Sequence, residues 1–285
     1  MSKVKKTKEH KFLNKHTILG VFLLMYFNFV LIDFVIGATS AIICEHAGID
    51  NKIGLGAGAI IGSILALIIW FRFFSPEYKW KPEIGSWGKS FRLLIPLYIY
   101  WVFLFSVFGY LAKSIPFGAI SLSSFLAAIM AGAGEEVAFR EVGISYLARQ
   151  WKDENKIILM AVIPAAAFAL THVTNIVSMG LSDVLKQALL TLFMGVFLGA
   201  VYIRTGNIWP IILGHSLHDI MAFSASEKLS MLGLNLPDWS VTLLIFIEAG
   251  LLISGLYMLR KSKRAEIIAL WNKRWSRDTG VTEEA

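Results

Sequence analysis

Three short groups of ionisable residues lie inside otherwise apolar stretches of the sequence. They are Glu135, Glu136, Arg140 and Glu141 in "AGAGEEVAFRE", His172 in "FALTHVTN", and His215, His218 and Asp219 in "GHSLHDI". Placing a charged side chain in a membrane span costs about 2.5–3.5 kcal/mol, so such residues are candidates for a functional site. Carboxylates and imidazoles can activate water, stabilise an oxyanion or bind a metal ion.

Helical spacing predicts which of these side chains share a face. Glu136 and Arg140 are four residues apart, so they are expected to form an ion pair, and His215 and Asp219 have the same spacing. Glu135 is turned away from Glu136 and is free to point elsewhere. At a rise of about 1.5 Å per residue, the three groups could meet within the membrane.

The residue types exclude several known ways of hydrolysing a bond inside a membrane. The H-E-x-x-H string of zinc proteases is absent, and no serine stands in a tight glycine-flanked turn with a histidine partner. An aspartyl pair would need a second aspartate beside Asp219, and Asp33 lies in a different context. A glutamate acting as general base with histidine partners remains.

Composition indicates a polytopic membrane protein. The 285 residues are 56% hydrophobic with a mean hydropathy of +0.64, and several apolar runs exceed the roughly 18 residues of a membrane helix. We expect an all-α transmembrane bundle with about eight spans, near residues 17–43, 53–74, 92–112, 120–148, 157–179, 184–203, 207–225 and 240–260. Glycines at four-residue spacing, Gly54, Gly58 and Gly62 with Gly195 and Gly199, suggest close helix packing.

Charge distribution indicates membrane topology rather than nucleic-acid binding. The net charge of +7 comes from basic residues at the two ends and in alternate loops, which predicts that both termini are cytoplasmic. The single cysteine, Cys44, excludes an internal disulfide framework. We expect no nucleic-acid partner and an integral protein of a membrane, with the compact chain and short loops favouring a bacterial cytoplasmic membrane.

The three motifs together resemble a known family. "EEVAFR", "FALTH" and "HSLHD" match the ordered pattern E-E-x-x-x-R, F-x-x-x-H and H-x-x-x-N/D of the CPBP family, which includes type II, Abi-like CAAX prenyl proteases and bacteriocin-processing enzymes. The resemblance covers roughly residues 118–225 and implies a four-helix catalytic core. It divides the chain into an N-terminal part with three spans, 1–117, that core, and a last span with a basic tail, 226–285.

The resemblance also implies roles for individual residues. Glu135 would be the general base, His172 would hold the water, and His215 with Asp219 would stabilise the oxyanion. Glu136 and Arg140 would form a supporting pair, and Phe168 would line the pocket. Position 219 is Asp where related prenyl proteases commonly have Asn. A charged Asp cannot donate a hydrogen bond to an oxyanion, so Asp219 would have to be protonated, orient His215 or ligate a metal.

Metal dependence and substrate stay open at this stage. Two histidines and two carboxylates, Glu135, His172, His215 and Asp219, could hold zinc, although a water activated by glutamate alone is favoured. The expected substrate is a peptide precursor, or a membrane or lipidated protein. The alternatives are a non-catalytic immunity or sensor-regulating protein on the same fold and, less favoured, a proton-coupled transporter. Glu141, His218, Glu248 and Asp33 have no assigned role.

Overall fold

The computed structural model describes residues 11–113, 120–178, 180–231 and 237–276, and every regular element within these ranges is a helix. The expected all-α class is therefore confirmed. The basic residues of 1–10, the expected domain boundary at 117–118 and the chain after 276 lie outside these ranges, as does the side chain of Asp33.

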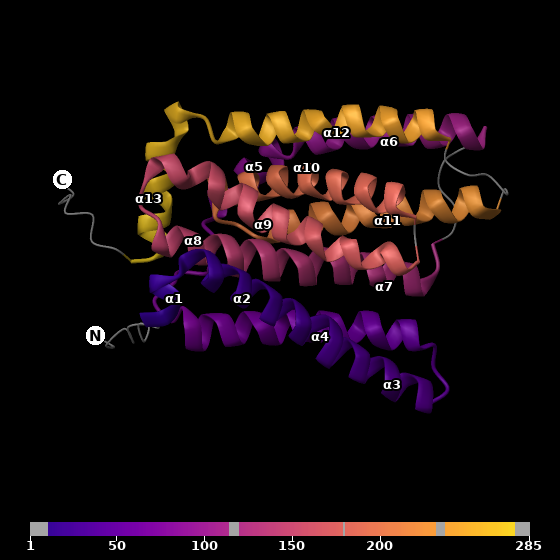
Figure 1. Ribbon diagram of the computed structural model, residues 1–285, viewed down its shortest axis with the longest axis horizontal. Coiled ribbons are helices and arrows are strands. Elements are labelled where there is room, and N and C mark those ends of the chain that lie inside the picture. The colour runs from indigo at the N-terminus through magenta and orange to yellow at the C-terminus, as the bar shows by residue number, and fades with distance from the viewer. Residues whose placement is uncertain (1–10, 114–119, 179, 232–236, 277–285) are drawn as a thin grey trace.

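The first half of the chain forms helices on two opposite sides of the bundle. Its elements are α1 (Lys11–Lys15), α2 (Thr17–Val30), η1 (Leu31–Gly37), α3 (Ala38–His46), α4 (Asn51–Ile69), η2 (Trp70–Phe74), α5 (Ile84–Leu93) and α6 (Ile95–Ala112). Helices α2, α3 and α4 lie together at the lower edge of Figure 1, while α6 lies at the opposite edge beside α12 and α5 packs against α10 and α11. The N-terminal segment thus encloses the rest of the bundle from two sides.

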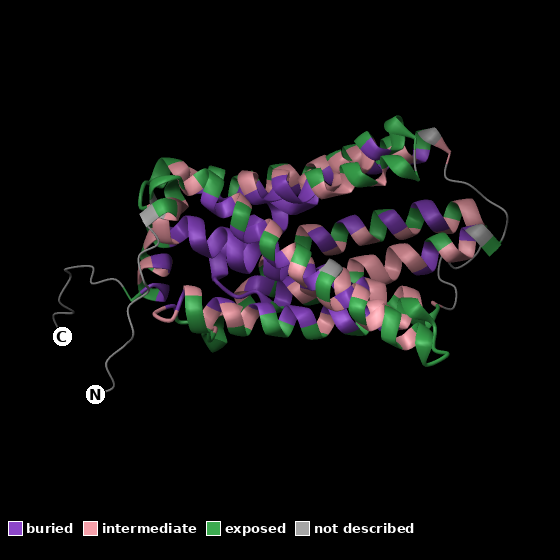
Figure 2. Cartoon of the chain, turned by 60° about the horizontal axis from the view of Figure 1, so that its bottom comes forward, coloured by how far each residue is buried: buried purple, intermediate pink, exposed green. Residues whose placement is uncertain are grey.

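The second half supplies the central helices. Its elements are α7 (Leu122–Met130), η3 (Ala131–Ile144), α8 (Ser145–Gln150), η4 (Glu154–Lys156), α9 (Ile157–Thr171), η5 (His172–Val177), α10 (Leu181–Thr205), α11 (Trp209–Met231), α12 (Asp238–Met258), η6 (Lys261–Lys263) and α13 (Arg264–Arg274). Helix α10 packs between α9 and α12. Buried residues gather in the half of the bundle nearer the two chain ends (Figure 2).

Seven helical stretches in the described part of the chain are long and apolar enough to cross a membrane: Thr17–His46, Asn51–Phe74, Ile95–Ala112, Leu122–Gln150, Glu154–Val177, Leu181–Thr205 and Trp239–Met258. Large apolar side chains on their outer faces are exposed, among them Val102 of α6 and Phe246 of α12. Such a surface suits lipid as the surrounding solvent.

The expected span at 207–225 corresponds to α11, which is not among these seven. Its apolar character is lowered by Ser216, His218, Asp219 and the charged residues Glu227 and Lys228. The helix nevertheless runs lengthwise in the bundle and packs against α7, η3 and α6 (Figure 1). A polar helix can occupy this position because neighbouring helices shield it from lipid.

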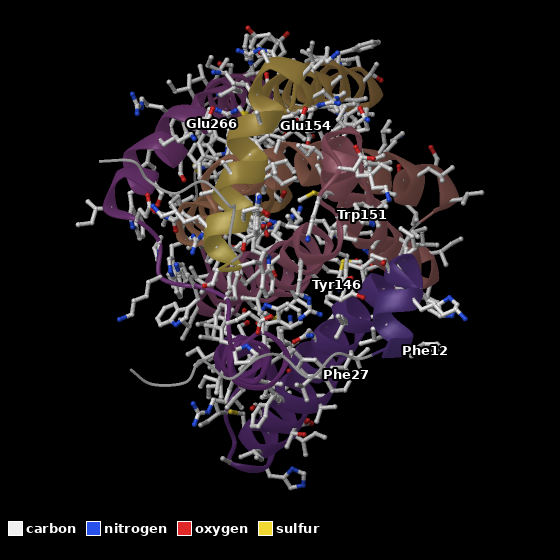
Figure 3. All side chains as sticks on the ribbon, turned by 90° about the vertical axis from the view of Figure 1, so that its left-hand side faces the viewer. Phe12, Phe27, Tyr146, Trp151, Glu154 and Glu266 are labelled. Carbon is white, nitrogen blue, oxygen red and sulfur yellow. The ribbon has the colours of Figure 1, made fainter. Side chains whose placement is uncertain are left out.

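Both described ends of the chain lie at the same end of the bundle. Helix α13 crosses that end, and α1 lies there too (Figures 1 and 3). The Trp271 indole donates to the Ile203 carbonyl at 3.0 Å, and Glu266 accepts hydrogen bonds from Lys89 at 2.7 Å and Arg204 at 3.4 Å. These bonds fasten α13 to α5 and to the last turn of α10, and the Lys89 ammonium holds the pKa of Glu266 below its ordinary value.

Part of the fourth span is wound more widely than an α-helix. Residues Ala131–Ile144, which contain the whole charged motif, form a π-helix, as do Leu31–Gly37 and Trp70–Phe74. A π-helix carries i→i+5 hydrogen bonds and is often found at functional sites. The sequence pattern predicted helix here but not this winding.

The glycine spacing predicted close helix packing, and α4 shows it. A Cβ atom at Gly58 would meet the side chain of Ser40 and would lie 2.9 Å from the Ile36 carbonyl oxygen. Gly195 is similar, because its Cβ would lie 2.9 Å from that of Ala165. These glycines let α4 approach η1 and α3, and α10 approach α9.

We expect Gly58→Ala to lower the free energy of unfolding by about 1–3 kcal/mol through overpacking. Gly88→Ala in α5 is the matched control, because nothing lies within 4 Å of its added Cβ and alanine favours helix by about 1 kcal/mol. Thermal unfolding of the purified protein in detergent measures both. Equal stability of the two variants would contradict the close packing of α4.

Candidate active site

The candidate site lies where η3, η5 and α11 approach one another. Gly132 permits the approach of η3 to α11, because a Cβ atom there would meet the Ser216 side chain and lie 2.7 Å from the Ser216 nitrogen. One turn further along η3, Glu135 and Glu136 begin the charged motif, and His215 precedes Ser216 on α11. The small residue therefore brings two of the three polar groups together.

The imidazole of His215 lies among three carboxylates. Its Nδ1 is 2.7 Å from Glu136 Oε1, and its Nε2 is 3.7 Å from both Glu135 Oε2 and Asp219 Oδ2. Glu136 and His215 are buried, whereas the side chains of Glu135 and Asp219 keep 19% and 18% exposure. Glu136 thus fixes the ring by one nitrogen, and the other nitrogen is turned toward the two more accessible carboxylates.

Glu136 and Arg140 form the expected ion pair at the centre of the site. Arg140 Nη1 lies 3.1 Å from Glu136 Oε1, and both side chains are fully buried. The angles of this contact do not make a hydrogen bond, and the Nε and both Nη atoms of Arg140 have no hydrogen-bond partner in the described part of the chain. The guanidinium is therefore held by charge, with the Phe168 ring 4.8 Å from its carbon.

Phe168 separates the two histidines. Its ring stands nearly perpendicular to that of His172, with centroids 5.1 Å apart, and to that of His215, with centroids 6.1 Å apart. Its side chain is buried and also contacts Phe139. The expected pocket-lining residue is therefore a packed spacer that sets the distance between the imidazoles.

His172 and Glu135 face the same cleft. The cleft has a volume of about 440 Å³, and its lining residues are Tyr26, Phe29, Val30, Glu135, Leu170, Thr171, His172, Thr174 and Asn175. Helix α9 ends at Thr171, and His172 begins a short 3₁₀ turn. The Nδ1 atom of His172 lies 3.2 Å from the Phe168 carbonyl oxygen, so an Nδ1–H tautomer donates there and leaves Nε2 available to the cleft.

The first span contributes to this cleft, which the motifs did not predict. The Tyr26 hydroxyl donates to the Ala167 carbonyl at 2.8 Å. The rings of Tyr26 and Phe29 both pack against Phe139. On the other wall, Asn175 donates to Gln187 at 2.9 Å. Aromatic residues of an apolar span carry no motif, so only their contact with η3 and α9 places them at the site.

Glu141, Glu248 and His218 are not among the residues that line this cleft. Glu141 is buried and accepts a hydrogen bond from Tyr202 at 2.7 Å, and Tyr202 lies 3.2 Å from the Tyr78 hydroxyl. Glu248 accepts from Tyr100 at 3.3 Å, and the Tyr100 ring lies 5.7 Å from that of His218. These residues complete separate polar contacts between helices, and His218 does not join His215.

The four residues considered for zinc do not form a preformed ligand group. No three His, Cys, Asp or Glu side chains among the described residues are placed to hold a metal ion together. Nδ1 of His215 is engaged by Glu136, and Nδ1 of His172 by a main-chain carbonyl. One ring nitrogen of each histidine, Nδ1, is therefore already engaged in a hydrogen bond.

Comparison with known proteins identifies the region that holds these residues. Residues 116–221 match the family model described as "Type II CAAX prenyl endopeptidase Rce1-like". No curated protein and no solved structure matches the chain. The matched range contains Glu135, Glu136, Arg140, Phe168, His172, His215 and Asp219.

We expect Arg140→Ala to lower stability by about 3–5 kcal/mol, because it leaves the Glu136 carboxylate buried without its cation. Arg92→Ala, which removes an exposed arginine of α5, is the control and should change stability by less than about 0.5 kcal/mol. The measurements are membrane abundance and thermal unfolding. A normally abundant, normally stable Arg140→Ala protein would argue against the supporting role of this ion pair.

Proposed function

Because residues 116–221 form a domain of the Rce1-like type II CAAX prenyl endopeptidase family, a family of hydrolases, we propose that the chain is an intramembrane endopeptidase in which Glu135 activates the attacking water. One observation carries the proposal. Glu135 faces a cleft that also holds His172, while the same carboxylate lies 3.7 Å from His215. The proposed base and a histidine that could bind the water thus share one cleft, and a second imidazole lies next to the base.

In the proposed first step, a water molecule lies between Glu135 and His172. The water donates one hydrogen bond to Nε2 of His172, and Glu135 takes its other proton as the oxygen attacks the scissile carbonyl carbon. A carboxylate suits this role in a partly dry site, because water there cannot compete strongly for its charge. The Phe168 carbonyl keeps the His172 ring in the required tautomer.

In the same step, negative charge develops on the carbonyl oxygen. His215 in its doubly protonated form donates Nδ1–H to Glu136 and presents Nε2–H toward the space between Glu135 and Asp219. That proton is placed to bind the oxyanion. Asp219, ionised, cannot donate to an oxyanion, and its proposed role is to orient the imidazole. Glu135 then passes its proton to the leaving amine.

The cleft suggests the kind of substrate. Its walls combine apolar side chains, Tyr26, Phe29, Val30 and Leu170, with the polar side chains of Thr174 and Asn175. An extended peptide with an apolar side chain fits such a lining, since its main-chain groups need hydrogen-bond partners. We propose that the substrate is a peptide precursor, or a tail of a membrane or lipidated protein.

The proposed orientation places both chain ends in the cytoplasm. The connections from α8 to α9 and from α12 to α13 lie at the end of the bundle that α13 crosses (Figure 1), and they carry Lys152, Lys156, Lys261 and Lys263. The main chain of Lys79 also contacts this end, because its N–H donates to the Arg274 carbonyl. Cytoplasmic loops carry such an excess of lysine and arginine. The proposed location is a bacterial cytoplasmic membrane.

We expect Glu135→Gln and His172→Ala each to lower the cleavage rate by about 10²–10⁴-fold, because each removes a participant in proton transfer. The purified protein in detergent is incubated with a peptide library, and new peptide termini are followed by mass spectrometry. Glu154→Gln, which changes an exposed loop carboxylate, is the control and should keep the wild-type rate.

Two results would count against the proposal. If folded Glu135→Gln and His172→Ala proteins cleave as fast as wild type, the assigned residues do not perform the reaction. If the wild-type protein yields no cleavage of any peptide or membrane-protein tail, a non-catalytic role on the same fold is favoured.

A further inference from the structure

A second cavity lies at the end of the bundle that α13 crosses, away from the candidate active site. It has a volume of about 440 Å³, and its lining residues are Lys79, Trp80, Lys81, Glu83, Ser86, Thr205, Leu270, Lys273 and Arg274. It shares no lining residue with the cleft of Glu135 and His172. Four of the nine side chains are cationic and one is a carboxylate.

Arg274 is a buried cation whose hydrogen-bond partners are main-chain carbonyls. Its guanidinium donates to the main-chain carbonyls of Lys79, Lys81 and Gly206, and it lies over the ring of Tyr78. It makes no ion pair with a carboxylate within the described ranges. Carbonyl dipoles satisfy its hydrogen bonds, and its charge, which burial makes costly, interacts with Glu83 and Glu141 without forming an ion pair to either.

The charged side chains that line the cavity together carry a net positive charge. Lys273 pairs with Glu83 at 2.7 Å, which occupies the only carboxylate among the lining residues. Lys79 has no charged partner in the described structure, and the Lys81 ammonium lies 6.0 Å from the centre of the Trp80 ring. The lining therefore carries an excess of positive charge, because four cationic side chains share one carboxylate.

The cavity lies at the level where several spans end. The stretch Asn51–Phe74 ends just before the segment 75–83 that supplies its lysines, and Thr205, the last residue of Leu181–Thr205, lines it directly. Helix α5 follows with Ile84, Trp87 and Phe91 exposed along its length. Figure 3 looks onto this end, with α13 across the front and Glu266 on it.

We propose that this cavity binds the phosphate headgroup of an anionic phospholipid. The lysines and Arg274 supply the charge for the phosphate, as basic pockets between membrane helices commonly do. The exposed apolar residues of α5 lie beside the opening, where acyl chains would cover them, and aromatic residues such as Trp80 and Trp87 favour the headgroup level. A free phosphate ion would satisfy the charge but not this apolar surface.

The test measures stabilisation of the purified protein by phosphatidylglycerol and by phosphatidylcholine, each titrated in detergent micelles and followed by thermal unfolding. We expect phosphatidylglycerol to raise the unfolding temperature saturably and phosphatidylcholine not to. The double variant Lys79→Gln with Lys81→Gln should weaken the apparent affinity by about fivefold for each charge removed.

The matched control is Lys152→Gln with Lys156→Gln, which removes the same charge from the loop between α8 and α9. It should keep the wild-type affinity within about twofold, because neither lysine lines the cavity. Equal weakening by both double variants would overturn the proposal in favour of general surface charge. Inorganic phosphate that protects at the same concentration as phosphatidylglycerol, or a lack of preference between the two lipids, would also overturn it.

Discussion

The buried carboxylate of Glu136 is the interaction on which the rest of the site depends. A single oxygen, Oε1, meets the Arg140 guanidinium on one side and Nδ1 of His215 on the other. An ionised carboxylate with no exposure requires cationic or donor partners, since its desolvation costs several kcal/mol. Arg140 lies on η3 itself, so its contact with Glu136 involves only that helix. His215 lies on α11, so its contact with Glu136 fixes the position of the second helix.

Two local features make this junction possible. Gly132 removes the side chain that would separate η3 from α11, and Glu135 and Glu136, as consecutive residues of one helix, project in different directions. As a result, Glu136 is enclosed while Glu135 opens onto the cleft. Two adjacent residues of the same type thus have different environments, which is the physical basis for assigning one to support and the other to chemistry.

Much of this arrangement could be predicted from the sequence, because it follows from composition and spacing. Long apolar runs predicted an all-α membrane bundle, and rare ionisable residues predicted which spans would meet. The i,i+4 rule also predicted the pairing of Glu136 with Arg140. The i,i+4 rule could not predict that His215 contacts the same Glu136 oxygen, because the two residues lie on different helices and are 79 residues apart in sequence.

Other features had no sequence signal strong enough to predict them. The π winding depends on hydrogen-bond register, which residue type specifies only weakly. Tyr26 and Phe29 are ordinary aromatic residues of an apolar span, so their place at the cleft follows from packing alone. Helix α11 is not among the apolar spans, and its packing against α7, η3 and α6 follows from the fold rather than from its own composition.

Glu141, the last residue of the charged motif, makes contacts that lie outside the cleft. Glu141 closes the motif and accepts a hydrogen bond from Tyr202, and Tyr202 contacts Tyr78. Tyr78 in turn lies under Arg274, the buried cation of the basic cavity. One helix therefore carries a carboxylate at the cleft and another at the start of a polar chain that reaches the end of the bundle. Because each group in that chain is buried and contacts the next, η3 is joined through side chains to the end of the bundle that α13 crosses.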